Sequence, residues 1–331
     1  MGDNPVGCLD GTGFGGDGEA VCDGGGVRFP GGLPVKVLTA FLLRNLFFCI
    51  FAPYKQFTHK MSTRKILFIT QLIEPYVAAS PLAERGRRIP QGIQELGNEI
   101  RTFVPKWGNI NERRHQLHEV IRLSGLNVII NDTDHPLIIK VATLQPARMQ
   151  VYFIDSEDYF QKRLMECDSE GKEYADNYER SIFYTRSVLE TIKKLRWYPD
   201  VIYLQGWISA TAPFYIKTVY KDDPAFANVK VVYGMSNFEL KAPMPENYND
   251  CLAFRNYTAD MIGGMGMDFR DADDFARFAI KFSDGVIVEE ESLKPELKAF
   301  AEAEGKPVLD CDGSEDAPRR YDEFLGTLFE D

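Results

Sequence analysis

The sequence lacks any pair of cysteines at the spacing of a metal or redox motif. Its six cysteines are scattered, and no two of them are separated by two residues. Neither a structural zinc site nor a dithiol redox site is therefore supported. The simplest interpretation is a set of reduced thiols, which predicts a cytoplasmic protein.

The chain also has fewer basic than acidic side chains. The chain has 38 lysines and arginines against 49 aspartates and glutamates, a formal net charge of −11. An acidic protein repels a phosphate backbone, so nucleic acid is not expected as a partner. Residues 1–60 carry five basic and five acidic side chains, so the whole excess of negative charge lies in residues 61–331.

No long hydrophobic run is free of charge. The most apolar stretch, residues 33–53, is interrupted by Lys36 and Arg44, and a central arginine costs roughly 2.5–3.5 kcal/mol on membrane insertion. A membrane is therefore not expected as a partner. Three interpretations stay open: a poor membrane anchor, an amphipathic surface helix, or a stretch that is not natural coding sequence. We favour the third, because Met61 opens MSTRKILFIT as an ordinary start would.

Residues 1–32 are rich in glycine and aspartate and have no hydrophobic period. Such a segment buries too little apolar surface to offset chain entropy, which predicts disorder. Its GxGxxG match at Gly11, Gly13 and Gly16 has no strand before it and no helix after it, so it is not a dinucleotide site. We therefore predict three parts: a disordered or non-native extension over 1–60, a folded domain over 62–310 and a tail helix within 311–331.

From residue 65 onward, short apolar runs alternate with segments of helical period. Strands are predicted at 65–70, 99–104, 127–130, 137–142, 150–154, 201–204, 229–233 and 285–288. Helices are predicted at 82–96, 176–196, 209–220, 272–282 and 292–303. This alternation is typical of a single Rossmann-like α/β domain with a parallel sheet covered on both faces. Ligands of such folds bind beyond the carboxyl ends of the strands, which directs attention to loops 71–81, 205–208 and 234–240.

Four segments resemble glycogen and starch synthases, in that family's order. The first runs from KILFIT to the PKWG beginning at Pro105. The second is PDVIYLQGWISATAP from Pro199, the third is KVVYGMSNFE from Lys230, and the fourth is IKFSDGVIVEEES from Ile280. The resemblance implies the N-terminal, acceptor-side half of a GT-B glycosyltransferase. It also implies an activity, the retaining transfer of glucose from ADP-glucose to an α-1,4-glucan, and it implies no metal or cofactor.

The departures from the family pattern fall in the three loops. Where the resemblance implies a phosphate-binding lysine and two glycines, the chain has Ala78, Ser80 and Pro81. Pro81 has no N–H to donate, and Ser80 followed by Pro81 is instead typical of a helix N-cap and first turn. The chain ends about forty residues after the fourth segment, so we expect no donor-side half of comparable size.

The remaining motif positions are also altered. Gln205 stands where the family histidine that contacts the transferred sugar is implied, and Ser236 stands where a second histidine is implied. Trp207 and Asn237 are retained. Trp207 is favoured as a packing residue over a sugar platform, whereas Asn237 is equally consistent with a turn and with a ligand contact. Glu289, Glu290 and Glu291 are predicted to open the following helix, where carboxylates suit the helix dipole.

These departures predict a non-catalytic member of α-glucan metabolism. It would bind an α-glucan or pair with a separate donor-domain protein, and it would not bind ADP-glucose usefully. One alternative is an active glucosyltransferase, working by itself or as the acceptor half of a split enzyme. Another is a structural or regulatory domain that has no sugar ligand.

Overall fold

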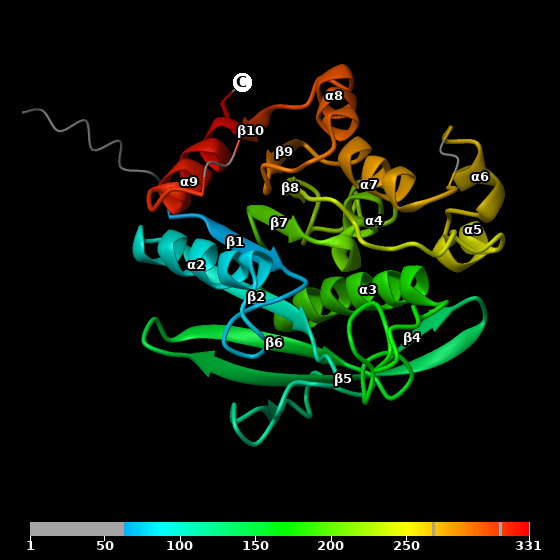
Figure 1. The fold of residues 1–331 in the computed structure, drawn as a ribbon, viewed down its shortest axis with the longest axis horizontal. Helices are drawn as coiled ribbons and strands as arrows, with labels where there is room; N and C mark the ends of the chain where they lie inside the picture. The colour runs from blue at the N-terminus through cyan, green and yellow to red at the C-terminus, as the bar shows by residue number, and fades with distance from the viewer. Residues whose placement is uncertain (1–62, 267–268, 311–312, 331) are drawn as a thin grey trace, which may run out of the picture. The chain divides into compact units, whose positions relative to one another are not determined.

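The computed structural model describes residues 63–266, 269–310 and 313–330 (Figure 1). The predictions for residues 1–60, including the apolar stretch 33–53 and the start at Met61, lie outside the described residues.

A parallel sheet forms the centre of the described domain and confirms the predicted α/β fold. Its strands run in the spatial order β10-β9-β8-β7-β1-β2-β6, and neighbouring strands in this series are parallel. The bounds are β1 (Lys65–Ile69), β2 (Glu99–Pro105), β6 (Met149–Asp155), β7 (Val201–Gln205), β8 (Lys230–Met235), β9 (Gly285–Val288) and β10 (Val308–Asp310). β7 is buried along its whole length, as the apolar run predicts for a strand covered on both faces.

An antiparallel extension continues the sheet beyond β6. β5 (Thr133–Leu144) pairs with β6, and β4 (Leu126–Ile130) and β3 (His118–Glu119) each pair with β5. Asn131 and Asp132 have positive φ angles at the tight turn between β4 and β5, a conformation that Asn and Asp tolerate better than most residues. The sequence predicted β4 and β5 as strands, whereas β3 and β10 were too short to detect.

The helices are α2 (Pro81–Glu95), α3 (Asn177–Leu195), α4 (Ala212–Lys217), α5 (Tyr248–Leu252), α6 (Ala259–Gly263), α7 (Ala272–Lys281), α8 (Pro295–Ala303) and α9 (Ala317–Thr327), with a 3-10 turn η1 (Trp207–Ser209). The predicted helix over 209–220 is too long, because α4 covers only Ala212–Lys217 and Ser209 belongs to η1. α5 and α6 have five residues each, too few to show a helical period.

Helices cover both faces of the sheet (Figure 1). α2 packs against α9, whereas α3, α4, α7 and α8 follow one another through a chain of mutual contacts. α9 is the helix predicted beyond residue 310, and it is fixed to the domain because Arg64 and Asp322 form an ion pair of 2.5 Å in which both side chains are at most 10% exposed. No helix among the described residues is long and apolar enough to span a membrane.

Candidate functional site

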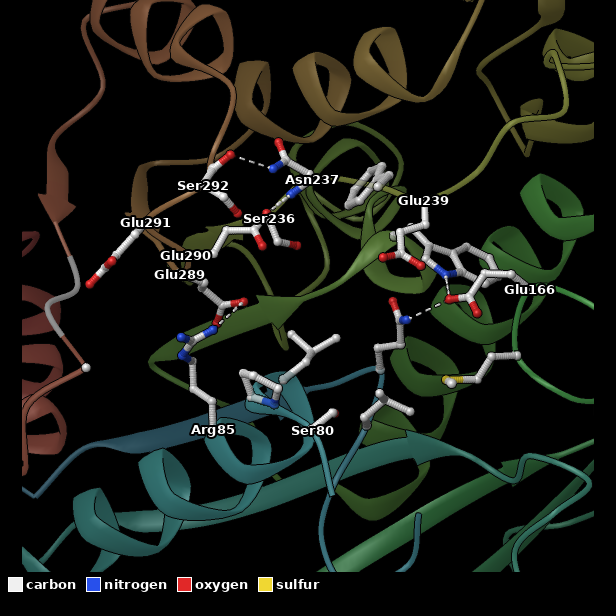
Figure 2. Close-up of a pocket in the computed structure, with 18 residues that line it drawn as sticks. Ser80, Arg85, Glu166, Ser236, Asn237, Glu239, Glu289, Glu290, Glu291 and Ser292 are labelled. Carbon is white, nitrogen blue, oxygen red and sulfur yellow. Dashed lines mark hydrogen bonds and ion pairs between the residues drawn. The ribbon is translucent and has the colours of Figure 1, made fainter. Parts of the chain in front are cut away.

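A cavity of about 760 Å³ opens beyond the carboxyl ends of β1, β7, β8 and β9, next to the start of α2 (Figure 2). All three loops singled out from the sequence contribute to its walls. The lining comprises Gln71, Leu72, Ser80, Pro81, Leu82, Arg85, Met165, Glu166, Trp207, Ser236, Asn237, Phe238, Glu239, Glu289, Glu290, Glu291, Ser292 and Gly313. The site therefore lies where parallel α/β sheets bind ligands.

The start of α2 forms one wall. Ser80 is the N-cap, its Oγ accepts the backbone N–H of Ala83 at 3.1 Å, and Pro81 opens the helix, so the predicted capping is confirmed. The Ser80 carbonyl accepts the N–H of Glu84 at 2.9 Å. Ala78 is exposed and is not part of the lining. The loop therefore presents a serine cap and a proline where a glycine loop would offer backbone N–H groups to an anion.

The segment that follows β7 forms the floor of the cavity. Trp207 lines the cavity but is only 2% exposed, and its indole N–H donates to Glu166 Oε1 at 2.8 Å. Glu166 Oε1 also accepts from Gln71 Nε2 at 3.1 Å. Gln205 does not line the cavity: its Nε2 lies 3.4 Å from the Leu82 carbonyl and from Glu289 Oε1. Trp207 is thus a packed, hydrogen-bonded residue. Gln205, which stands where the resemblance implies a histidine, lies behind the residues that line the cavity.

Buried Arg180 fixes the segment that presents Glu166. Its guanidinium donates to the carbonyls of Tyr159 at 3.0 Å, of Leu164 at 2.8 Å and of Met165. Burial lowers the pKa of Arg180 to about 9. A buried cation that satisfies successive carbonyls holds an irregular loop in one conformation, because each carbonyl would otherwise be buried without a donor.

The loop after β8 forms the opposite wall. Ser236 and Asn237, which the sequence analysis singled out, both line the cavity. The Asn237 Nδ2 donates to the Ser292 carbonyl at 2.8 Å, its Oδ1 accepts the N–H of Lys294 at 3.0 Å, and its backbone N–H donates to Glu290. Asn237 therefore joins the loop after β8 to the loop after β9, which favours the turn role over ligand contact.

Glu289 is the residue that sequence reasoning misplaced. α8 begins at Pro295, so the prediction that Glu289, Glu290 and Glu291 open that helix is wrong. Glu289 follows β9 directly and is 1% exposed. Its Oε1 accepts hydrogen bonds from the Tyr203 hydroxyl and from Gln205 Nε2.

Gly234 explains how a carboxylate fits into the sheet at this point. A Cβ on Gly234 would lie 2.5 Å from the Tyr203 hydroxyl and 2.6 Å from the Glu289 carboxyl carbon. A glycine inside a strand often marks such a close approach. Gly234, next to the end of the run KVVYGM, was therefore the signal in the sequence that could have located a buried side chain here.

Burial raises the pKa of Glu289, and the guanidinium of Arg85 opposes this shift. The Arg85 Nη1 lies 3.9 Å from Glu289 Oε2 (Figure 2). A carboxyl group taken out of water favours its neutral form unless a cation compensates. At 3.9 Å the guanidinium of Arg85 offsets the cost of burying the carboxylate only in part. Glu289 is therefore a titratable group in the wall of the cavity.

A family model described as the starch synthase catalytic domain matches residues 65–308. The chain belongs to this family.

Relatives and a solved structure agree with this assignment. Glycogen synthases of Chlorobium limicola and Chlorobaculum tepidum are each 35% identical over 182 residues, which is 55% of this chain and 37% of each relative. The chain thus matches little more than a third of the length of these curated relatives. The catalytic domain of starch synthase IV from Arabidopsis thaliana, bound to ADP and acarbose, superposes with a TM-score of 0.60 at 15% identity, covering 75% of this chain and 51% of that chain. It supports the fold.

The charge lining this starch synthase-family cavity is strongly negative. Its described lining residues include five glutamates and a single arginine: Glu166, Glu239, Glu289, Glu290, Glu291 and Arg85. No group of three or more histidine, cysteine, aspartate or glutamate side chains in the described part of the chain has the arrangement to hold a metal ion. The cavity is therefore suited to donors of hydrogen bonds and to cations more than to anions.

Proposed function

We propose that this starch synthase-family domain is a non-catalytic, acceptor-side module of α-glucan metabolism. It would bind an α-glucan, or pair with a protein that carries the donor-side domain, and it would not bind ADP-glucose usefully. The observation that carries the proposal is the composition of the cavity: five glutamates lie around it, and a serine-capped, proline-started helix stands where a glycine loop would receive phosphate.

Electrostatic repulsion determines how much the cavity weakens the binding of a diphosphate. Two like charges about 8 Å apart in an effective dielectric of about 20 repel by roughly 2 kcal/mol. A diphosphate in this cavity would meet several such carboxylates against the single guanidinium of Arg85. Because about 1.4 kcal/mol corresponds to a tenfold change in affinity, the lining disfavours a nucleotide diphosphate by orders of magnitude. A neutral glucan experiences no comparable repulsion, and its hydroxyls donate hydrogen bonds to carboxylates.

The alternative is an active glucosyltransferase, which family membership and the guanidinium of Arg85 favour. Isothermal titration of the whole chain with ADP-glucose and, separately, with maltoheptaose distinguishes the two. We expect heat of binding with maltoheptaose and no saturable binding of ADP-glucose at millimolar concentration. Micromolar affinity for ADP-glucose would contradict the proposal. Binding of neither ligand would favour a structural or regulatory domain that has no sugar ligand.

A further inference from the structure

A chain of four polar side chains joins the β4–β5 hairpin to the start of α3. His135 of β5 lies with its Nδ1 2.7 Å from Asp158 Oδ2 and with its Nε2 3.0 Å from the Tyr159 hydroxyl oxygen. The Tyr159 hydroxyl in turn donates to Glu179 Oε1, in the first turn of α3. His135 is 8% exposed and Tyr159 is 2% exposed, whereas the side chain of Asp158 is 48% exposed. The outer end of the chain of side chains is therefore open to water, with which the histidine can exchange protons.

The hydrogen bonds of this chain require a proton on both ring nitrogens of His135. Burial, together with the neighbouring Glu179, raises the pKa of Tyr159, so its hydroxyl keeps its single proton and donates it to Glu179. The Tyr159 oxygen must then accept from Nε2. An ionised carboxylate also only accepts hydrogen bonds, so Asp158 takes the proton of Nδ1. A histidine that donates from both nitrogens is an imidazolium.

The charged groups of the neighbouring elements suit a cation at this position. They are three carboxylates and two guanidinium groups on the turn after β6 and at the start of α3: Asp158, Asp176, Glu179, Arg163 and Arg180. One negative charge is in excess, and an imidazolium cancels it. The ring of His135 otherwise meets the aromatic rings of Tyr159 and Phe183, with centroids 4.7 Å and 6.4 Å away, and β4 places the apolar Val128 opposite it.

Loss of one ring proton breaks this chain of hydrogen bonds. A neutral imidazole carries a single N–H. If Nε2 keeps the proton, the carboxylate of Asp158 loses its donor. If Nδ1 keeps it, Nε2 and Glu179 compete for the one proton of the Tyr159 hydroxyl. The contacts that remain at the ring are also weaker, because charge-assisted hydrogen bonds are roughly twice as strong as neutral ones.

Tyr159 connects these side chains to the cavity. Its carbonyl accepts from Arg180, whose guanidinium also holds the carbonyls of Leu164 and Met165. Met165 and Glu166 line the cavity. A change in the position of Tyr159 would therefore be transmitted to the wall of the cavity.

We propose that His135, with Asp158, Tyr159 and Glu179, forms a pH-sensitive latch. In its protonated form the histidine ties the β4–β5 hairpin and the turn after β6 to the start of α3, and it thereby holds residues 156–166 against the cavity. Histidine is the side chain that ordinarily changes its charge between about pH 5 and 8, so the latch weakens as the pH rises through this range. The inference concerns the conformation of the cavity wall, and it holds whichever ligand the cavity binds.

Hydrogen exchange of the whole chain between about pH 5.5 and 8 tests the proposal, since this range covers the titration of histidine. The backbone N–H groups of Phe160, Gln161 and Arg163 are hydrogen-bonded within the segment and report its order. Protection is calculated against the intrinsic exchange rate at each pH, which removes the direct effect of pH on exchange. We expect the protection of residues 156–166 and of the first turn of α3 to fall roughly tenfold as the pH rises, the effect of losing one charge-assisted hydrogen bond. The protection of α9, which packs against α2, should stay constant. Constant protection of residues 156–166 would overturn the inference.

Three variants identify the cause. His135→Gln cannot gain the charge, so its protection should be independent of pH, whereas His118→Gln, an exposed histidine of β3, should keep the dependence of the wild type. Tyr159→Phe removes the link to Glu179, so the first turn of α3 should lose its dependence on pH. A dependence that persists in His135→Gln, or at the start of α3 in Tyr159→Phe, would contradict the latch.

The ring nitrogens of the wild type provide a test that needs no variant. The chain has four histidines, and in ¹⁵N spectra the contacts with Tyr159 and Phe183 identify His135. We expect both ring nitrogens to carry a proton at the acidic end of the range and one of them at the alkaline end, with the fall in protection following this change. A ring that is neutral over the whole range, or a fall in protection without a change at the ring, would overturn the inference.

Discussion

Gly234 and Glu289 show how one residue without a side chain permits another to be buried. Alanine at position 234 would place a Cβ 2.5 Å from the Tyr203 hydroxyl and 2.6 Å from the Glu289 carboxyl carbon. Overpacking of this kind costs about 1–3 kcal/mol. We expect Gly234→Ala to lower the free energy of unfolding by that amount, measured by urea denaturation.

A double-mutant cycle assigns the cause of this loss. In a Glu289→Ala background the added Cβ no longer meets a carboxyl group, so the cost of Gly234→Ala should fall. Gly263→Ala is the matched control, because its Cβ would have only an ordinary contact of 3.6 Å with Asn249 Nδ2. An equal cost of Gly234→Ala in both backgrounds would show that the contact with the Tyr203 hydroxyl, rather than the one with the Glu289 carboxyl group, sets the cost.

The titration of Glu289 predicts a pH dependence of stability. Its pKa is raised in the folded protein, chiefly by burial, so the folded state holds the proton more tightly than the unfolded chain. The resulting stabilisation is present below the unfolded value near 4.5 and is lost as the pH rises through the folded pKa. We expect the free energy of unfolding of the wild type, relative to Glu289→Gln, to fall as pH increases above this value.

The glutamine variant is its own control, since it has the same shape but cannot titrate at this position. Subtracting its pH profile from that of the wild type removes the contribution of the other groups. A difference that stays flat with pH, or that rises, would mean that Arg85 compensates the carboxylate fully.

At the scale of elements, α9 completes the face of the sheet that α2 covers. Asp322 on α9 accepts a hydrogen bond from Arg64 at 2.5 Å and another from Asn98 Nδ2 at 2.9 Å. Removing one partner of a buried ion pair costs about 3–5 kcal/mol, because the other charge is left buried. We expect Asp322→Ala to reduce the free energy of unfolding by this amount, with a matching fall in Tm.

Asp316→Ala provides the comparison on the same helix. Asp316 and Arg319 form a pair of 3.6 Å in which both side chains are more than 60% exposed, and exposed pairs contribute at most about 1 kcal/mol. Similar small losses for both variants would indicate that α9 is a separable tail. A large loss for Asp322→Ala alone would place the boundary of the domain beyond residue 310.

At the scale of the whole molecule, the negative charge of the cavity predicts that substituting a few residues will not produce glucosyltransferase activity. Ala78→Lys, Ser80→Gly, Pro81→Gly and Gln205→His together would introduce the family residues, but Glu289, Glu290 and Glu291 would still line the cavity. We expect neither the wild type nor this variant to incorporate labelled glucose from ADP-glucose into glycogen, because the departing diphosphate would not be stabilised.

A thermal melt of the variant checks that it is folded, and an active starch synthase serves as the positive control. Incorporation by the wild type that disappears when ADP-glucose is omitted would overturn the non-catalytic proposal. Incorporation only after a donor-domain protein is added would favour the split enzyme.

The sequence by itself determined the features that depend on neighbouring residues. β1 and β7 are apolar runs because helices cover both faces of the sheet, and such runs are visible without coordinates. The Ser80 cap and Pro81 at the first turn were predictable because capping joins residues three apart. The predicted parallel direction implied that the three loops lie at one edge of the sheet, whereas the order of the strands, which brings their residues into one cavity, came only from the structure.

Only the tertiary structure decided the role of Glu289. Locally, EEES after an apolar strand is typical of a helix start, and nothing within a few residues contradicts that interpretation. Its burial depends on the space left by Gly234, the hydroxyl of Tyr203 and the guanidinium of Arg85. These groups lie between 55 and 204 positions away in the sequence. The cost of burying this carboxyl group is partly offset by partners that only the packed sheet and α2 bring together, so the local pattern could not reveal it.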